Sequence, residues 1–331
     1  MTTDVFAAQG SPMGMLFTGQ GSQKAGMLTE MYQDFIQVRE CFAEASEAVG
    51  FDLWQIAQGD PRLNQTEFTQ PVILTCSVAL WRLWQALGGL TPTVLAGHSL
   101  GEYSALVAAE VLSLSDAVRL VHVRGQLMQA AVPVGTGAMA AIIGLDDQVV
   151  IDGCAKVNRE LAQVVEAANF NAVGQVVIAG TQAAVQQAMA EFKALGGKAL
   201  ALPVSVPSHC SLMQPAAVQL AELLQQTAFH APVIPVIQNA QAAIASDVAA
   251  IRQALIDQLC QPVRWTQSMQ MVAEMGIQQL VECGPGNVLV GLAKRMPQGF
   301  TAYPVDTRSR FEDALEQVAV TETSVAGGKI A

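Results

Sequence analysis

Residues 94–109 read VLAGHSLGEYSALVAA, and this stretch decides the fold. Its first three residues, Val94 to Ala96, are apolar and typical of a short buried strand, whereas the residues from Leu100 onward favour a helix. Gly97-His98-Ser99 lies at the junction, where the chain must turn sharply. A strand, a tight turn and a helix in immediate succession predict an α/β architecture.

The turn carries the pattern G-x-S-x-G, from Gly97 to Gly101. In a nucleophile elbow, glycines two positions before and after the serine let the chain turn without side-chain clashes. The hydroxyl of Ser99 would then project from the turn, and the backbone N–H of Leu100 would face an oxyanion. A chance pentapeptide in a loop is the alternative, but the strand and helix on either side favour a nucleophile.

A serine hydroxyl needs a base, and the chain offers four histidines. His98 lies in the elbow itself, where its side chain should point away from the serine, so we expect a packing or hydrogen-bonding role for it. His122 lies in the middle of a predicted helix, and His230 lies in a loop. His209 follows an inserted segment, at a junction that we expect to form a cleft wall, and is the preferred base. Nucleophile before base matches the chain order of α/β-hydrolase-like sites.

Two further features are candidates for the same site. Gly19-Gln20-Gly21 follows the apolar strand Met15-Leu16-Phe17, and backbone N–H groups in such a loop can hold an oxyanion, although a simple tight turn is an open alternative. Arg124 lies in a predicted helix over 113–132; a buried Arg there would need an anionic partner such as a carboxylate, whereas an exposed one would form a surface ion pair. No acidic residue stands out as the third member of a triad.

The middle of the chain has a different pattern of elements from its two ends. Between Pro133 and Pro207 we predict the order strand, helix, strand, strand, helix, strand, which is typical of ferredoxin-like units. We therefore predict a discontinuous α/β-hydrolase-like large domain over 13–134 and 205–310, with an inserted ferredoxin-like subdomain over 135–204. Residues 1–12 and 321–331 are small, polar or glycine-rich and are expected to be flexible termini.

Composition argues against several classes of protein. The formal net charge is -11, with no basic stripe, so nucleic-acid binding is not expected, although one or two Arg side chains can still hold a small anion. We recognise neither a secretory leader nor a run of about 18 apolar residues, so we expect a cytoplasmic protein without membrane contact. The six cysteines are scattered without metal-ligand spacing, and no bound metal is expected.

Seven ordered blocks of sequence resemble those of the malonyl-CoA:acyl carrier protein transacylases of bacterial type II fatty-acid synthesis, within the acyltransferase superfamily. The resemblance covers about 13–310. The blocks are FTGQGSQ (17–23), TQPVILTCSVAL (69–80), AGHSLGEYSALVAA (96–109), GAMAAIIGL (137–145), NFNAVGQVVIAG (169–180), PVSVPSHCSLM (203–213) and ECGPGNVLVGLAKR (282–295).

The resemblance implies roles for the reacting groups. Ser99 would be the acylated nucleophile and His209 the general base and acid. The backbone carbonyl of Gln258 would orient the histidine and so take the third place of the triad. The backbone N–H groups of Gln20 and Leu100 would form the oxyanion hole.

The resemblance also implies how the acyl group is recognised. Arg124 would pair with the free carboxylate of the malonyl group, and Asn169, Asn171 and Met128 are further candidates for substrate contact.

Two local choices favour malonyl over branched extender units in this superfamily, namely Leu100 after the nucleophile and Ser208 before His209. The stretch over 206–209 also differs from the HAFH or YASH usual in polyketide synthase domains. Thr18 replaces the proline usual in close relatives, a change that stiffens the loop less and removes no catalytic group.

The implied reaction is a ping-pong transfer from malonyl-CoA, through an ester on Ser99, to the phosphopantetheine thiol of an acyl carrier protein, with no cofactor. The carrier protein would be a transient partner, with Lys294 and Arg295 in a basic patch near the cleft, and the enzyme is expected to be a monomer. The alternatives are a serine thioesterase or esterase, a free-standing acyltransferase of a polyketide pathway, and a non-catalytic scaffold that binds carrier proteins.

Overall fold

The structure is a computed structural model that describes residues 12–133, 135–204, 206–245 and 247–325. Of the two predicted flexible termini, residues 1–11 and 326–331 lie outside the described residues. The last helix, α13, runs over Arg308–Val325 and so includes residues that we expected to be loose. It is anchored by Phe311, Ala314 and Val318, which are buried against the core.

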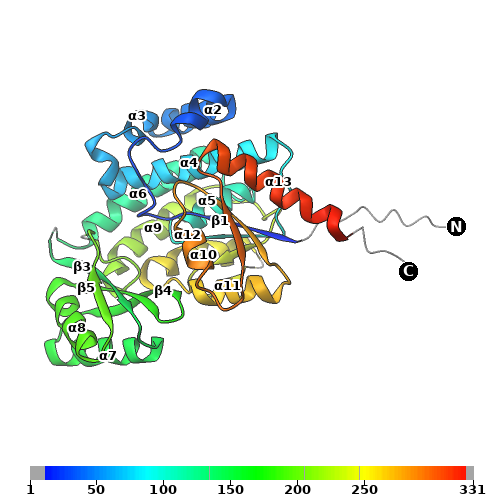
Figure 1. Cartoon of the computed structure of the whole chain (residues 1–331). Helices are drawn as coiled ribbons and strands as arrows, with labels where there is room; N and C mark the ends of the chain where they lie inside the picture. Colours follow the sequence, from blue (N-terminus) through cyan, green and yellow to red (C-terminus); the bar gives the residue numbers. More distant parts are fainter. Residues whose placement is uncertain (1–11, 134, 205, 246, 326–331) are drawn as a thin grey trace, which may run out of the picture.

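A six-stranded sheet forms the centre of the larger part of the molecule (Figure 1). Its order is β10-β9-β1-β2-β7-β8, and all neighbours are parallel except the hairpin of β7 and β8. The strands are β1 (Met13–Phe17), β2 (Val94–Gly97), β7 (Val236–Gln238), β8 (Ala243–Ile244), β9 (Gln279–Cys283) and β10 (Thr301–Pro304). Because Phe17 is paired with Gly97, the loops that follow β1 and β2 leave the same edge of the sheet side by side.

Alternate residues of the strands point into two hydrophobic cores, as the two-residue period of a strand requires. Met15 and Phe17 of β1 pack into the larger core, whereas Leu16 packs into the smaller one. The larger core also contains residues of α2 (Ile36–Val49), α4 (Thr66–Ala86), α5 (Gly101–Ala108), α6 (Leu114–Ala131), α9 (Gln214–Gln226), α10 (Val248–Cys260) and α13. The smaller core contains α11 (Trp265–Glu274) and α12 (Val288–Ala293). The sheet is therefore covered on both faces, as parallel sheets are.

Helix α4 has a proline in its second turn. It begins at Thr66 and includes Pro71, which has no N–H to donate to the carbonyl of Glu67 one turn earlier. The side chain of His122 on α6 supplies the missing donor: its Nδ1 lies 2.8 Å from the carbonyl oxygen of Glu67. Gly125, one turn further along α6, allows this approach, because a Cβ there would lie 2.5 Å from the Cα of Glu67. His122 thus has a structural partner that the sequence alone did not indicate.

Several short elements were not predicted, because two to six residues are too few to show a helical or strand period. They are β7, β8, β10, α12, α3 (Leu53–Ala57) and the 3₁₀ turns η1 (Pro61–Asn64) and η2 (Ser211–Met213).

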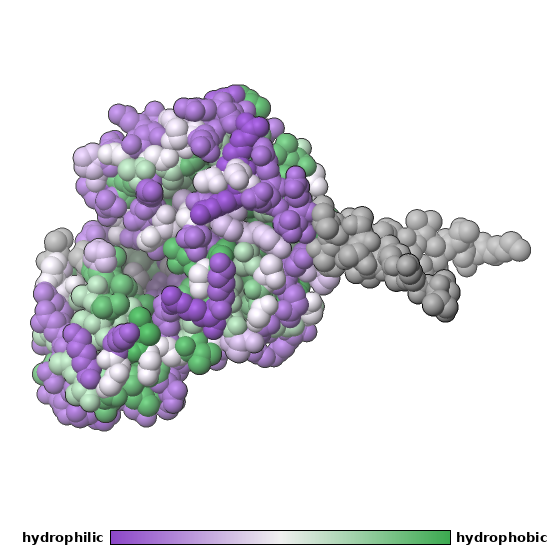
Figure 2. Space-filling view, in the orientation of Figure 1, coloured by the Kyte–Doolittle hydropathy of each residue, from purple (hydrophilic) through white to green (hydrophobic). Residues whose placement is uncertain are grey.

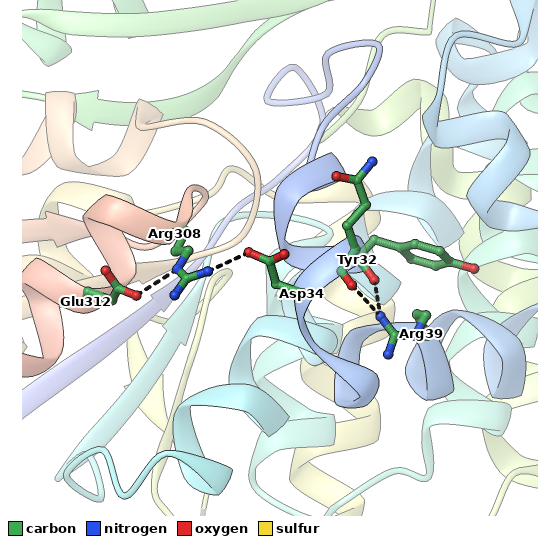
Figure 3. A network of polar contacts seen from close by, with 6 residues as sticks. Tyr32, Asp34, Arg39, Arg308 and Glu312 are labelled. Carbon is green, nitrogen blue, oxygen red and sulfur yellow. Dashed lines mark hydrogen bonds and ion pairs between the residues drawn. The ribbon is translucent and has the colours of Figure 1, made fainter.

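Near the first helix, α1 (Thr29–Asp34), Arg308 of α13 bonds to Asp34 and Glu312, each at 2.8 Å (Figure 3). Arg39 of α2 donates to the carbonyls of Tyr32 and Gln33 at the carboxyl end of α1, where a cation is favoured.

A separate four-stranded antiparallel sheet has the order β4-β5-β3-β6. Its elements are β3 (Gly137–Ile143), α7 (Asp147–Leu161), β4 (Val165–Ala172), β5 (Gln175–Thr181), α8 (Gln182–Ala194) and β6 (Lys198–Ala201), in the predicted order. Backbone hydrogen bonds join β4 to the loop after α10: Val263 N–H donates to Ala168 O, and Phe170 N–H donates to Val263 O. The mixed α/β class predicted from the sequence is confirmed.

Candidate active site

The turn between β2 and α5 holds Ser99 in a strained backbone conformation, with φ at 52°. The glycines on either side are required by space. A Cβ on Gly97 would lie 1.9 Å from the carbonyl carbon of Gly101, and a Cβ on Gly101 would lie 2.1 Å from the carbonyl oxygen of Phe17. The turn therefore has the tight, glycine-bracketed geometry of a nucleophile elbow, as predicted.

His209 lies beside the serine although 110 residues separate the two in sequence. Its Nε2 is 2.8 Å from Ser99 Oγ, and its Nδ1 is 2.6 Å from the carbonyl oxygen of Gln258. A carbonyl can only accept, so Nδ1 carries the proton and Nε2 is left to accept one from the serine. Burial, and after it the charge of Arg124, lowers the pKa of His209 to about 3, so the imidazole is neutral at neutral pH. A neutral imidazole bonded to a hydroxyl is the state that a general base requires.

Arg124 reaches the site from α6 and is 1% exposed. Its Nη1 donates to Gln70 Oε1 at 2.8 Å, and its Nη2 donates to Gln258 Oε1 at 2.9 Å and to Ser99 Oγ at 3.5 Å. Burial lowers its pKa from the ordinary value of an arginine. Within the described residues, no Asp or Glu forms an ion pair with Arg124. A buried guanidinium whose hydrogen-bond partners are neutral is suited to bind an anionic ligand beside the serine.

These groups line a cavity of about 320 Å³ between the two sheets, within the size range of small-molecule sites. Figure 2 shows the surface hollowed between the unit that contains the four-stranded sheet, β3 to β6, and the rest of the molecule. Eight of the nine predicted site residues line this cavity, namely Gln20, Ser99, Leu100, Arg124, Met128, Asn169, Asn171 and His209. The ninth, Gln258, is fully buried behind the histidine.

The predicted oxyanion donors lie in two loops that touch each other. A Cβ on Gly19 would lie 2.4 Å from the carbonyl oxygen of His98, so the loop after β1 packs directly on the elbow. Leu100 is the N-cap of α5, where backbone N–H groups point outward and an anion is favoured. Within the described residues, neither the N–H of Gln20 nor that of Leu100 has a protein acceptor. Both are therefore available to a ligand oxygen.

His98, the histidine of the elbow, has the packing and hydrogen-bonding role that we expected. His98 Nε2 is 2.8 Å from Asn171 Oδ1 on β4, and its ring lies 5.3 Å from that of Trp265. Burial lowers its pKa. Asn171 thus links the small sheet to the elbow as well as lining the cavity, whereas His230 lies at a different pocket.

Two residues that the sequence did not indicate hold this site from behind. Gln70 binds Arg124, and Asn239 binds the elbow just before the serine: its Oδ1 accepts from Ser99 N–H and its Nδ2 donates to Gly97 O, both at 2.6 Å. Gln70 lies in the block TQPVILTCSVAL, but no pattern within that block indicated that its side chain faces a cation. Asn239 lies just after the unpredicted strand β7 and gave no signal.

Comparison with known proteins places this geometry in a family. The acyl transferase domain family matches residues 15–301. The malonyl CoA-acyl carrier protein transacylase of Salmonella typhimurium is 53% identical over 305 residues, which are 91% of this chain and 98% of that protein. The chain belongs to the malonyl CoA-acyl carrier protein transacylase family. Membership makes it an acyltransferase, as the sequence blocks had indicated.

Solved structures of this transacylase family have the same fold. The crystal structure of FabD from Acinetobacter baumannii is 60% identical, with a TM-score of 0.93 over 94% of this chain and 99% of that one. A malonyl-transacylase in complex with a type II PKS acyl-carrier protein is 49% identical, with a TM-score of 0.91 over 93% of this chain and 100% of that one. No helix in the described part of this family member is long and apolar enough to cross a membrane.

Proposed function

We propose that this protein transfers the malonyl group of malonyl-CoA to the phosphopantetheine thiol of an acyl carrier protein, and so supplies extender units for fatty-acid synthesis. The observation that carries the proposal is the convergence of three groups in one cavity. Ser99 is bonded to a neutral His209, and the buried cation of Arg124 lies 3.5 Å from the same hydroxyl. A nucleophile, its base and an anion-binding group are therefore arranged around one reacting atom.

In the first half-reaction His209 Nε2 takes the proton of Ser99 as Oγ attacks the thioester carbonyl. The carbonyl oxygen becomes an oxyanion, which the N–H groups of Gln20 and Leu100 would hold. The intermediate collapses by breaking the carbon–sulfur bond, and the histidine returns its proton to the departing sulfur. The products are free coenzyme A and a malonyl ester on Ser99.

In the second half-reaction the carrier thiol takes the place of coenzyme A. His209 removes the thiol proton, the sulfur attacks the ester carbonyl, and the carbon–oxygen bond to Ser99 breaks. The proton then returns from His209 to Oγ, so the enzyme is regenerated without a cofactor. The carbonyl of Gln258 accepts the Nδ1 hydrogen bond throughout, which keeps Nε2 facing the serine.

Arg124 favours malonyl transfer over the esterase alternative. A malonyl thioester carries a free carboxylate, which can form a bidentate pair with a guanidinium, whereas a neutral acyl group offers nothing to a buried cation. Asn169 and Met128 line the same cavity and would contact the acyl or pantetheine chain. The scaffold alternative would require degenerate catalytic groups, and the Ser99–His209 pair is intact.

The carrier protein would approach the cavity past α12. Lys294 and Arg295 are exposed at the end of this helix, and Arg295 bonds to Gln175, which lines the cavity. An acidic carrier would be attracted there despite the net charge of the whole chain. The monomeric state and the cytoplasmic location stay predictions.

We also infer the finer description of the fold. The large unit, over 13–134 and 205–310, is α/β-hydrolase-like, supported by its nucleophile at a strand-to-helix turn of a parallel sheet. The unit over 135–204 is ferredoxin-like, supported by a sheet in which its first strand, β3, lies between its third and fourth, β5 and β6.

A short pulse of malonyl-CoA followed by intact-protein mass spectrometry tests the proposal. We expect one malonyl adduct on the wild-type protein, none on Ser99→Ala, and loss of the adduct when carrier protein carrying phosphopantetheine is added. Fast release of coenzyme A without any thiol acceptor would instead indicate a hydrolase.

A further inference from the structure

Glu102 is a fully buried carboxylate directly behind the nucleophile, in the first turn of α5. Its Oε2 accepts two hydrogen bonds, from the backbone N–H of Asn239 at 2.9 Å and from Nε2 of Gln258 at 2.9 Å. Within the described residues it forms no ion pair, and its Oε1 has no partner. Burial raises its pKa to about 7. A buried acid without an ion pair destabilises the folded protein, so a role for it in the site is the natural reason for its presence.

The two donors to this oxygen together hold the reacting groups. Asn239 binds Ser99 N–H and Gly97 O, both on the N-terminal side of the strained serine. Gln258 donates from the same Nε2 to Ser99 O at 3.0 Å, accepts from Arg124 at Oε1, and accepts from His209 at its backbone carbonyl. One carboxylate oxygen is thus the shared acceptor of the two residues that fix the nucleophile Ser99, the base His209 and the cation Arg124.

The polarity of the Gln258 amide follows from its neighbours. Arg124 can only donate, so the oxygen of the amide must face it, and the nitrogen must face the acceptors Ser99 O and Glu102 Oε2. A reversed amide would place its NH₂ group against the N–H of Arg124 and its oxygen against the oxygens of Ser99 and Glu102. Oε2 of Glu102 therefore contributes to the orientation of the side chain whose own backbone carbonyl binds His209.

We propose that Glu102 is a positioning residue for acyl transfer, which acts by accepting hydrogen bonds at Oε2 from Asn239 and Gln258. The inference rests on the proposed function for its reaction, but it concerns the geometry of Ser99 and His209 in any acylation of the serine. The function depends on the position of Oε2 and not on the charge of the carboxylate, because both hydrogen bonds are accepted by this one oxygen.

Two conservative substitutions separate position from charge. Glu102→Gln can keep a carbonyl oxygen at the place of Oε2, whereas Glu102→Asp keeps the acid but withdraws it by one methylene from both donors. We expect the single-turnover rate constant for malonylation of Ser99 to fall at least tenfold in Glu102→Asp and less than threefold in Glu102→Gln, since small displacements of reacting groups slow catalysis strongly. A rate constant per active site does not change when part of a sample is merely unfolded.

The matched control is Glu282, a second fully buried glutamate whose pKa is also raised to about 7 and which accepts from two backbone N–H groups, those of Leu289 and Val290. Glu282→Asp should lower the melting temperature but change the rate constant less than threefold. An equal loss of rate in Glu102→Asp and Glu282→Asp, the reverse order of the two Glu102 variants, or an unchanged rate in Glu102→Asp would each overturn the proposal.

A fluorophosphonate that labels Ser99 distinguishes this inference from the proposed function, because labelling needs the serine and the histidine but no malonyl group. If the wild type is labelled but not malonylated, the proposed function fails, and the order of labelling rates among the Glu102 variants still decides the positioning role.

Discussion

The carbonyl oxygen of Gln258 accepts a hydrogen bond from Nδ1 of His209 at 2.6 Å. A carboxylate in this place would stabilise the imidazolium that forms during the reaction, whereas a neutral carbonyl mainly fixes the tautomer and the direction of the ring. Gln258 adds a second function through its side chain, which joins Arg124 to the elbow. One residue therefore contacts both the arginine and the histidine of the candidate site.

Removal of the base should nearly abolish acylation. In His209→Ala, the one described side chain left within hydrogen-bond distance of Ser99 Oγ is Arg124, which can only donate and so cannot take the proton. We expect the rate of malonylation to fall by about 10²–10⁴. Stopped-flow release of coenzyme A measures it, with His122→Ala as a histidine control outside the cavity; a loss below tenfold in His209→Ala would contradict the assignment.

Arg124→Ala should change which acyl group is accepted. Without the guanidinium, the carboxylate of malonyl has no cationic partner, while acetyl-CoA loses nothing. We expect kcat/KM for malonyl-CoA to fall at least 100-fold, about 2.7 kcal/mol or more of transition-state stabilisation, and the ratio of acetyl to malonyl transfer to rise. Unchanged selectivity for malonyl-CoA over acetyl-CoA would refute the role of Arg124.

The pKa of His209 predicts a pH dependence of stability. Its folded value of about 3 lies below the ordinary 6.5, so between these values the unfolded chain binds a proton that the folded protein does not. The contribution to stability is therefore complete above pH 6.5 and is lost as pH falls below it. From pH 7 to 5 the wild type should lose about 2 kcal/mol relative to His209→Gln.

Urea denaturation of both proteins at each pH measures this difference. The comparison cancels buried acids such as Glu282, whose raised pKa acts in the opposite direction, favouring the folded state as pH falls from 7. A difference between the two proteins that does not vary with pH would mean that His209 titrates normally in the folded state.

The glycines of the elbow should tolerate no side chain. Gly101→Ala places a Cβ 2.1 Å from the carbonyl oxygen of Phe17, and backbone cannot move away as a side chain can. We expect a loss of at least about 3 kcal/mol in the free energy of unfolding. Gly291→Ala on α12 is the control: outside its own helix, no atom of the described residues lies within 4 Å of the added Cβ, and alanine there should stabilise by up to about 1 kcal/mol. Equal effects of the two changes on chemical denaturation would contradict this account.

His122 and Pro71 should be energetically coupled. His122→Ala leaves the carbonyl of Glu67 without its donor, which should cost about 1–3 kcal/mol in unfolding free energy. In a Pro71→Ala background the backbone N–H of residue 71 can bond to this carbonyl instead, so the same change should cost less. A double-mutant cycle measures the coupling, and strict additivity would show that the His122 contact is not compensating for the proline.

The sequence by itself determined the parts of this protein that depend on local order. The spacing of glycines around Ser99, the alternation of strands and helices, and the βαββαβ order of the small unit are properties of short stretches. Each short stretch has a period or a steric requirement that can be read directly.

Only the tertiary structure decided what holds the site together. Asn239 and Gln258 bind Ser99 and Glu102 through hydrogen bonds between residues 137 to 159 positions apart in the chain. No pattern in the sequence indicates that these polar residues are buried together. Glu102 in particular lies in a helix where an acidic side chain ordinarily faces solvent. Its burial follows from the packing of α5 against the sheet, and its hydrogen bond to Gln258 joins it to α10. Contacts between residues so far apart in the chain leave no local pattern in the sequence.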